Sequence, residues 1–447
     1  MTFLLLTLIA LLAFAATRMR SFQLVGGDSR LLHSRPRYYG SYGALLAFGP
    51  ACLVLMCWSL LQPVVLSQIT YAQLTADHIA AAGSADLALT EIRRTANGAI
   101  EGSEAAQLLA ARLTQLKATG DTLKVAIVLV LSVLGAGVAW AQITPQMRAR
   151  NRVERSVQWL LIAAASLAIL TTLGIILSLL FNTIGFFRLH PATDFFFGLV
   201  WQPSFGGGSS LGVLPLLWGT LYISLIALAV AVPIGLMSAI YLSEYAGSRF
   251  RSTAKPLLEV LAGIPTIVYG LFALVTVGPF LLGVFGNDGL GWMAGGTAVI
   301  TAGLVMGIML IPFVSSLSDD IINAVPQSLR DGSLGLGATR SETIRQVVLP
   351  AALPGIVGAI LLAASRAIGE TMIVVLGAGA AARLSMNPFD AMTTVTAKIV
   401  SQLTGDSDFL SPEALVAFAL GMTLFAITLA LNVFALFIVR KYREQYE

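Results

Sequence analysis

The sequence predicts an all-α protein that crosses a membrane several times. Of its 447 residues, 57% are hydrophobic and only 11% are charged, whereas soluble proteins average about 45–50% apolar and about 25% charged residues. Apolar stretches that approach the length of a spanning helix, about 20 residues, occur nine times. Lys and Arg gather in alternate connecting segments, as is typical of polytopic membrane proteins. A soluble globular enzyme is therefore excluded.

Hydropathy places the nine spans and divides the chain in two. The expected spans are 2–16, 43–66, 125–141, 159–181, 211–243, 257–282, 298–317, 353–377 and 415–439. We assign residues 1–157 to an N-terminal extension with three spans and residues 158–447 to a second domain with six. The connection at 67–123 is Ala-rich and has a helical apolar spacing, so we expect an extracytoplasmic helical hairpin there. This hairpin is either a docking surface or a plain solvated connection.

The basic residues predict the orientation of the chain. Eighteen of the Lys and Arg residues lie in one set of alternate loops and seven in the other. Because cytoplasmic loops collect Lys and Arg, the N-terminus is expected outside and the C-terminus in the cytoplasm. The first span is short enough to be a cleaved signal peptide, but its positive residues, Arg18 and Arg20, follow the apolar run. This order favours an uncleaved anchor.

Sites for metals and nucleotides are not indicated. His33, His78 and His190 lie in three separate loops, without metal-ligand spacing. None of the five lysines follows a glycine, so no phosphate-binding P-loop is present. The charge pattern does not support nucleic-acid binding. We expect the chain to bind no cofactor and any ATP to be used by another chain.

The segment 318–350 is unusually patterned for a loop between two spans. Pro326 can start a short helix, Gly335 and Gly337 can break it, and a second amphipathic helix is expected from Arg340 to Val347. Asp319 and Asp320 are expected to cap the short helix before this loop. Two short helices that meet at a glycine turn form a compact projection. An interfacial helix on lipid headgroups is the alternative.

This loop resembles the EAA motif of ABC importer permeases, which reads E-A-A, three residues, G, nine residues, I-x-L-P. The corresponding positions are Asp331, Gly332, Ser333, Gly337, Val347, Leu349 and Pro350. The spacing agrees throughout, while Asp for Glu, Gly and Ser for the two Ala, and Val for Ile are departures. The resemblance implies a MetI-like core of five to six helices and a coupling loop that docks on an ATPase subunit.

Two further stretches are similar to phosphate-importer permeases. One runs from Gly219 to Tyr245 and continues at 261–270, and the other is Arg366-Ala-Ile-Gly-Glu-Thr-Met372. The second resembles the PstC-type subunit, since the PstA-type partner usually continues Gly-Glu-Thr-Ala-Pro. The resemblance covers roughly 195–443, and the first three spans carry none. It implies a bacterial inner-membrane location and three kinds of partner: a PstA-type permease, two PstB-type ATPases and a periplasmic PstS-type phosphate-binding protein.

Arg366 and Glu370 indicate a path for an anion independently of the family resemblance. Both lie near the middle of the eighth span, where an arginine costs about 3 kcal/mol by insertion scales, so such residues normally face a bundle interior or a water-filled path. A spacing of four places them on one face of a helix, with Thr371 beside them. The alternative is a buried ion pair that only holds helices together.

The sequence therefore predicts a permease subunit of an ATP-driven importer of inorganic phosphate, in contact with membrane lipid. An importer of another oxyanion, such as molybdate or sulfate, is the alternative within this class. An ion-coupled secondary transporter would show inverted repeats and more carboxylates within its spans. A membrane scaffold or signalling subunit would use the hairpin and the loop, and Arg366 would be structural.

Overall fold

The computed structural model describes residues 2–74, 84–98, 100–101, 103–204, 208–287, 289–405 and 411–443. It consists of two compact units, Met1–Leu170 (unit 1) and Thr171–Glu447 (unit 2). Over these described ranges, nine helices are long and apolar enough to cross a membrane. The predicted all-helical polytopic fold is confirmed. The domain boundary predicted at residue 157 stays a prediction, because helix α6, Ala149–Leu189, runs unbroken through it and through Leu170.

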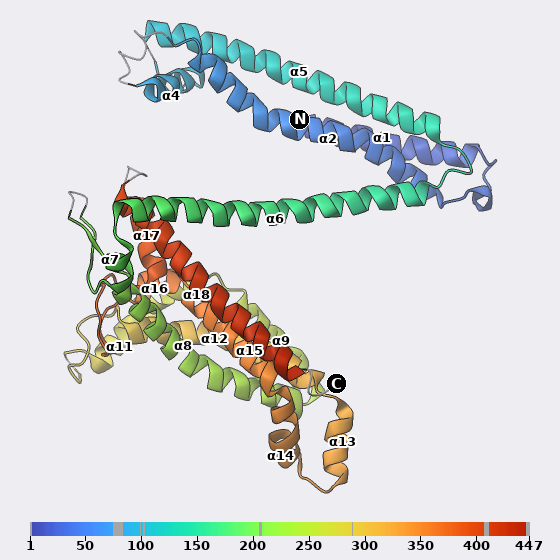
Figure 1. Ribbon diagram of the computed structural model, residues 1–447. Helices are drawn as coiled ribbons and strands as arrows, with labels where there is room; N and C mark the ends of the chain where they lie inside the picture. Colours follow the sequence, from blue (N-terminus) through green and yellow to red (C-terminus); the bar gives the residue numbers. More distant parts are fainter. Residues whose placement is uncertain are drawn as a thin grey trace. The chain divides into compact units, whose positions relative to one another are not determined.

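Unit 1 is a small antiparallel bundle. Its elements are α1 (Thr2–Gln23), the short 3-10 helix η1 (Ser29–Leu31), α2 (Pro36–Tyr71), α4 (Ala85–Ala96), α5 (Glu104–Gln142) and the first half of α6. Helices α1, α2 and α5 pack along one another (Figure 1). Gly135 of α5 lies against the backbone of α2, where a Cβ would overlap the Leu46 carbonyl. Such small residues let membrane helices approach closely.

The predicted hairpin is present in the described part of 67–123. Helix α4 packs on the start of α5 through Ile92, Ala106 and Ala110, which are buried, and Leu109 and Leu113 pack against them. One detail differs from the sequence prediction. Helix α5 runs from Glu104 to Gln142, so the outer arm of the hairpin and the third span are one continuous helix. No proline interrupts this helix, and Gly120, Gly135 and Gly137 are tolerated within it.

Unit 2 contains the remaining elements in chain order. They are α7 (Ala192–Phe197), β1 (Trp201–Gln202), β2 (Ser210–Leu211), α8 (Leu214–Ile240), the π-helical turn η2 (Tyr241–Tyr245), α9 (Ser248–Ala262), α10 (Thr266–Phe272), the π turn η3 (Ala273–Val277), α11 (Gly278–Phe285), α12 (Val299–Ala324), α13 (Gln327–Gly335), α14 (Arg340–Thr343), the π turn η4 (Ile344–Val348), α15 (Leu349–Ile368), α16 (Met372–Gly377), α17 (Val395–Gly405) and α18 (Pro412–Arg443). The two strands pair antiparallel, with Trp201 opposite Leu211.

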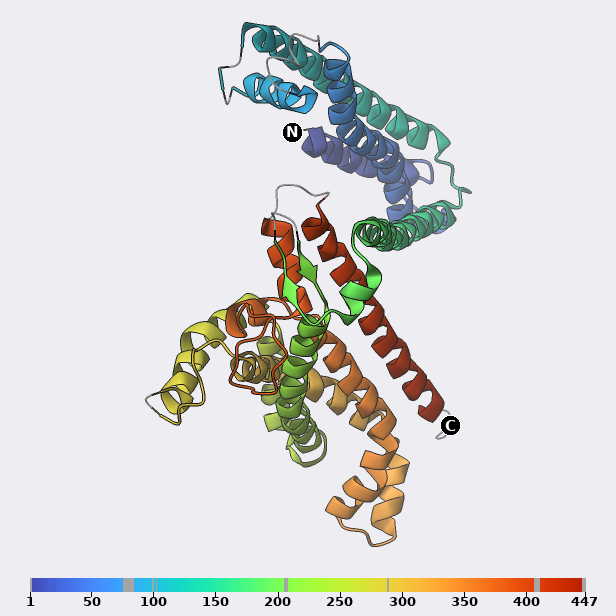
Figure 2. The same ribbon diagram turned by 60° about the vertical axis from the view of Figure 1, so that its left-hand side comes forward.

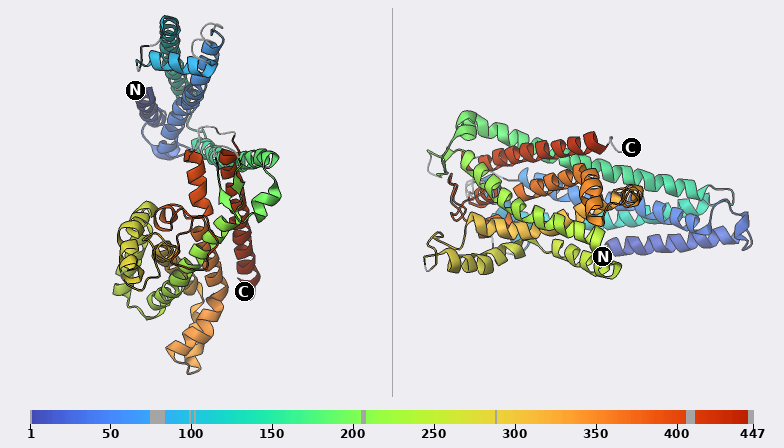
Figure 3. Two further views of the ribbon diagram at one scale, coloured as in Figure 1. Left: turned by 90° about the vertical axis from the view of Figure 1, so that its left-hand side faces the viewer. Right: turned by 90° about the horizontal axis from the view of Figure 1, so that it is seen from below.

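Helix α12 is the centre of unit 2. Two thirds of its most apolar window, 67%, is buried, more than in the other candidate spans. It packs on α8 and α15, and α18 covers the other side of α15. The α13–α14 pair projects from the end of the unit opposite the β1–β2 strands (Figure 2), and a second direction of view shows the same projection (Figure 3). Helix α15 therefore runs from the α13–α14 projection into the interior of the unit.

Two predicted spans are broken in the structure. The sixth, 257–282, divides at Gly263 and Pro265 into α9 and α10, because proline has no N–H to continue the helix. The eighth, 353–377, divides after Ile368 into α15 and the short α16. Both breaks lie inside stretches that hydropathy assigned as single spans, so hydropathy did not locate them.

Candidate functional site

Within 318–350, two short helices meet at a glycine turn, as the sequence predicts, but Gly335 belongs to the first helix, and the second continues from Thr343 through η4 into α15. Helix α13 starts after Pro326, and the chain then turns at Gly337, whose φ is +88°, a left-handed value that favours glycine. Thr339 starts the second helix with a capping box, in which its hydroxyl accepts from the Glu342 N–H and the Glu342 carboxylate accepts from the Thr339 N–H. We call α13, the turn and α14 the coupling knob.

Two arginines connect the coupling knob to η2, the π turn that follows α8. The Arg330 guanidinium donates to the Glu244 carboxylate at 3.0 and 3.2 Å, and to the carbonyls of Ile322 and Val325 at 2.7 and 2.6 Å. These carbonyls belong to the last turn of α12 and its C-cap, where a cation is favourable. Arg340 also donates to the Glu244 carbonyl and lies over the Tyr245 ring. The sequence analysis did not single out Glu244, because its partner Arg330 lies 86 residues away in the sequence.

The residues at the EAA-like positions divide into an exposed and a packed group. Asp331, Gly332 and Gly337 are exposed on the knob, and the Asp331 carboxylate accepts from Gln327 at 3.1 Å. The hydroxyls of Ser333 and Thr343 lie 2.9 Å apart and join the two helices of the knob.

The remaining positions lie where η4 joins α15. Val347 of η4 and Leu349 of α15 are half-buried, and Pro350 in the first turn of α15 is exposed. At the tip of the knob, Leu336 is 92% exposed.

The expectation that Asp319 caps a short helix is wrong. Asp319 lies inside α12 and is 2% exposed. Its carboxylate pairs with Arg251 at 3.0 Å and with Lys255 at 2.9 Å, both from α9. Lys255 also pairs with Asp320 at 3.0 Å. Its hydrogen bonds to Asp319 and Asp320 raise the pKa of the Lys255 ammonium. The cluster joins α9 to α12, and the separation of more than 60 residues explains why the sequence does not reveal it.

Arg366 lies in the last turn of α15, about 25 Å along the helix from Leu349 at 1.5 Å per residue. Its guanidinium lies 5.4 Å from the centre of the Phe313 ring, near the midpoint of α12. The side chain is exposed in this chain. No carboxylate of the described residues lies within 4.0 Å of it. An arginine beside the middle of a spanning helix therefore keeps its hydrogen-bond donors available for an anion.

Glu370 does not share a helical face with Arg366, and this prediction is wrong. Helix α15 ends at Ile368, and Glu370 follows in the break before α16. Glu370 is 9% exposed, and its carboxylate accepts from the Met372 N–H at 3.1 Å. Its carbonyl accepts from the Thr396 hydroxyl at 2.7 Å. Within the described ranges the two side chains form no ion pair, because the break turns the Glu370 carboxylate toward α16.

The break also determines the position of Thr371 and includes residues that the sequence did not single out. Thr371 is half-buried before the first residue of α16, and its hydroxyl reaches only the Gly369 carbonyl, at 3.4 Å. The Thr396 hydroxyl of α17 donates to the Glu370 carbonyl in the break, and the Phe313 ring contacts Arg366. The cluster Thr393-Thr394-Val395-Thr396 in an apolar stretch was the one signal that could have revealed Thr396.

Metal ligands do not gather in the part of the chain that the structure describes. There, no group of three or more His, Cys, Asp or Glu side chains is placed to hold an ion. His190 stacks on Phe186, with ring centroids 5.4 Å apart, and His33 contacts Ser34. His78 lies outside the described residues.

Comparison with known proteins connects both units to transport systems. Residues 3–171 match a family described as "Phosphate ATP-binding cassette transporter", and residues 231–444 match "Binding-protein-dependent transport system inner membrane component". The first match corrects our expectation that the first three spans carry no resemblance. A chain of a bacterial ABC transporter that imports alginate is 16% identical, with a TM-score of 0.47, over 66% of this chain and 99% of that one. That likeness is too weak to bear on the substrate.

Curated relatives give a finer comparison. The chain is 33% identical to the "Phosphate transport system permease protein PstC 1" of Mycobacterium bovis, over 65% of this chain and 94% of that one. It is 37% identical to the "Phosphate transport system permease protein PstC" of Mesorhizobium japonicum, over 48% and 70%. It is 32% identical to the "Probable ABC transporter permease protein YqgH" of Bacillus subtilis, over 62% and 85%. The chain, a multi-pass membrane protein, belongs to the PstC family of ABC transporter permeases.

Proposed function

We propose that this chain is the permease subunit through which an ATP-driven importer moves inorganic phosphate, and that Arg366 provides the cation on the path. The observation that carries the proposal is the unpaired Arg366 guanidinium beside Phe313, at the midpoint of the most enclosed helix. Phosphate near neutral pH carries one to two negative charges, and moving it through a low-dielectric path without a counter-charge is costly. A fixed cation lowers that barrier where it is highest.

The chemistry of arginine suits this role. Its planar guanidinium presents several N–H donors in a fork that matches two oxygens of an oxyanion. Glu370 accepts from Met372 and does not occupy these donors. In this proposal Glu370 is first a positioning residue, since it stabilises the break that ends α15 next to Arg366. Thr371, at the same break, offers a hydroxyl to the path.

Energy reaches the path along α15. The helix joins the coupling knob to Arg366 without interruption, so movement of the knob displaces the guanidinium. We propose three kinds of partner for this PstC-type chain. A PstA-type permease completes the path, two PstB-type ATPases use the ATP, and a PstS-type protein delivers phosphate. The proposed location is the bacterial inner membrane, with the N-terminus outside and the C-terminus in the cytoplasm.

Reconstitution tests this function directly. The chain is co-expressed with its candidate partners and placed in proteoliposomes, and ATP hydrolysis and uptake of labelled phosphate are measured. We expect both to depend on phosphate-loaded binding protein and to persist when an uncoupler collapses the proton gradient. Uptake that sulfate or molybdate inhibits as strongly as phosphate does would identify another oxyanion as the substrate. Uptake that the uncoupler abolishes would identify a secondary transporter instead.

A further inference from the structure

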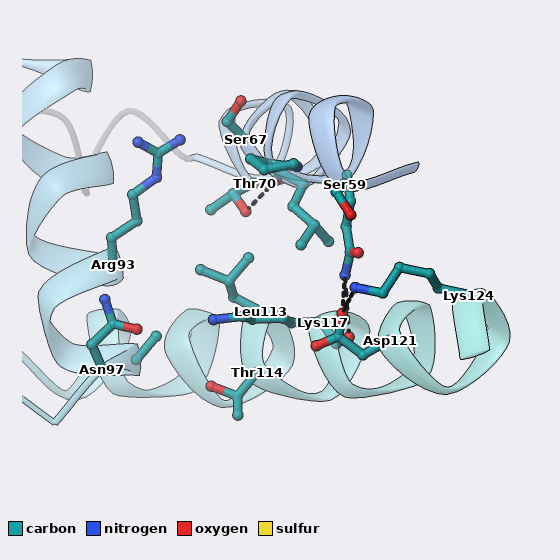
Figure 4. Close-up of a pocket in the computed structure, with 14 residues that line it drawn as sticks. Ser59, Ser67, Thr70, Arg93, Asn97, Leu113, Thr114, Lys117, Asp121 and Lys124 are labelled. Carbon is teal, nitrogen blue, oxygen red and sulfur yellow. Dashed lines mark hydrogen bonds and ion pairs between the residues drawn. The ribbon is translucent and has the colours of Figure 1, made fainter. Parts of the chain in front are cut away.

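A cavity of about 450 Å³ with several charged and polar lining residues lies in unit 1, where α2, α4 and α5 meet. Figure 4 shows it between the end of α2, the α4 helix that carries Arg93, and the first part of α5. Its charged lining residues are Arg93, Lys117, Asp121 and Lys124. None of these residues belongs to the phosphate path proposed above.

The cavity has an excess of positive charge. Asp121 is already engaged, since its carboxylate pairs with Lys124 at 2.7 Å and accepts from Gln62 at 3.2 Å. Neither Arg93 nor Lys117 has an ion-pair partner among the residues described. Three cations therefore accompany one carboxylate in the lining, and two of them, the exposed Arg93 and Lys117, form no ion pair within 4.0 Å in the described residues. Such a site attracts an anion, and an arginine beside a lysine is suited to the oxygens of a phosphate group.

Further donors line the same cavity. The Asn97 amide and the Ser59 hydroxyl have no hydrogen-bond partner within the described ranges. An unpaired cation can be solvated by water, so these groups alone do not specify the ligand. The neighbouring surface is what distinguishes a free anion from a larger one.

An apolar groove of about 480 Å³ continues from the cavity along α2 and α5. The two share Gln62 and Leu66, so they are contiguous. The groove extends beyond the cavity to Leu53 and Trp58, which lie farther than any cavity residue of α2 from the end of that helix at Tyr71. The Trp58 indole Nε1 is buried without an acceptor among the described atoms. A ligand that fits both parts has an anionic head, an apolar tail and hydrogen-bond acceptors between them.

We propose that unit 1 binds an anionic phospholipid at this site. The headgroup phosphate lies against Arg93 and Lys117, and an acyl chain lies in the groove beside Leu53, beyond Trp58. Lipid ester oxygens are acceptors at the depth of Trp58, as is usual for tryptophan at a membrane interface. Free phosphate would use the cavity but would leave the groove and the indole N–H without a role. The site is independent of the transport function proposed for Arg366.

Native mass spectrometry of the full chain tests the proposal. The chain is purified in detergent and exposed to phosphatidylglycerol or phosphatidylcholine with identical acyl chains, and the retained lipids are counted. We expect one phosphatidylglycerol to be retained in preference to phosphatidylcholine. Arg93→Gln and Lys117→Gln should each weaken its retention about fivefold, the usual effect of one cation near an anionic lipid.

Matched controls on the same helices are available. Arg94 and Arg112 are exposed, do not line the cavity, and should tolerate Gln without loss of lipid. Equal retention of the two lipids would overturn the proposal, and so would an equal effect of Arg94→Gln. Glycerol 3-phosphate, which lacks the tails, should not displace the lipid. Displacement by millimolar inorganic phosphate, lost in Arg93→Gln, would assign the cavity to free phosphate and overturn the lipid assignment.

Discussion

Arg330 and Glu244 form an ion pair at 3.0 Å that joins the coupling knob to η2, and their side chains are only 12% and 11% exposed. Removal of one partner from such an enclosed pair typically costs about 3–5 kcal/mol, because the other charge is left without compensation. The same guanidinium also satisfies two terminal carbonyls of α12. This pair therefore fixes the knob against η2 and the end of α12.

We predict that Arg330→Ala uncouples the transporter. The knob should lose its fixed position, and phosphate-stimulated ATP hydrolysis in proteoliposomes should fall at least tenfold while the chain still inserts. Arg345→Ala is the control, because Arg345 is exposed and forms no ion pair with a described residue. Equal hydrolysis in the Arg330→Ala and wild-type complexes would show that the pair does not matter for coupling.

The turn of the knob gives a second prediction. Gly337→Val should distort the knob, because a left-handed backbone costs about 1–2 kcal/mol for an L-residue and more when the side chain is β-branched. The cost is conformational alone, since a Cβ there would meet no atom within 4 Å. The ATPase subunit should no longer co-purify or be stimulated.

Gly335 is a matched control two residues earlier. It is the last residue of α13, has no positive φ, and also has open space around its Cβ position. Gly335→Val should therefore retain most of the ATPase association. Normal transport by Gly337→Val would argue against the docking role of this loop.

A third prediction concerns Arg366. Arg366→Gln should abolish or severely reduce phosphate uptake without loss of assembled complex, because the path loses its only identified cation. Arg366→Lys should keep part of the uptake, since a point charge replaces a bidentate donor. If the residue only held helices together, uptake and assembled protein would fall in proportion in Arg366→Gln.

Glu370 provides a separate comparison. Glu370→Ala removes the acceptor for the Met372 N–H, whereas the amide oxygen of Glu370→Gln can still accept it. We expect Gln to retain more uptake than Ala, as befits a positioning residue. The Arg366→Gln, Glu370→Gln double variant should not regain activity, because the two side chains are not paired in the described structure. Its recovery would identify a structural ion pair.

A fourth prediction tests the orientation. The charge split places Ser103 outside and Asn151 inside, and both residues are exposed in the structure. After removal of Cys52 and Cys57, a cysteine at position 103 should react with an impermeant thiol reagent in intact cells. A cysteine at position 151 should react only after the membrane is opened. Reversed labelling would place the coupling knob outside and exclude contact with a cytoplasmic ATPase.

The sequence by itself determined the features that local chemistry controls. Nine apolar stretches predicted nine spans, since the hydrocarbon core admits a helix wherever about 20 residues are apolar. Pro326, Gly337 and the Thr339–Glu342 capping box specified the helices of the knob, because each acts through its own backbone or that of a residue within one turn. The family followed from the same segments, and the comparisons confirmed it.

The tertiary structure decided the features that depend on distant partners. The predicted eighth span continues through Gly369, whereas α15 ends at Ile368, and the Thr396 hydroxyl, 26 residues away, donates to the Glu370 carbonyl in the break. The burial of Asp319 likewise depends on Arg251, 68 residues away in sequence. A local pattern cannot contain such contacts, because they form only after the helices have packed. The separation of Arg366 from Glu370 follows from the same physical fact.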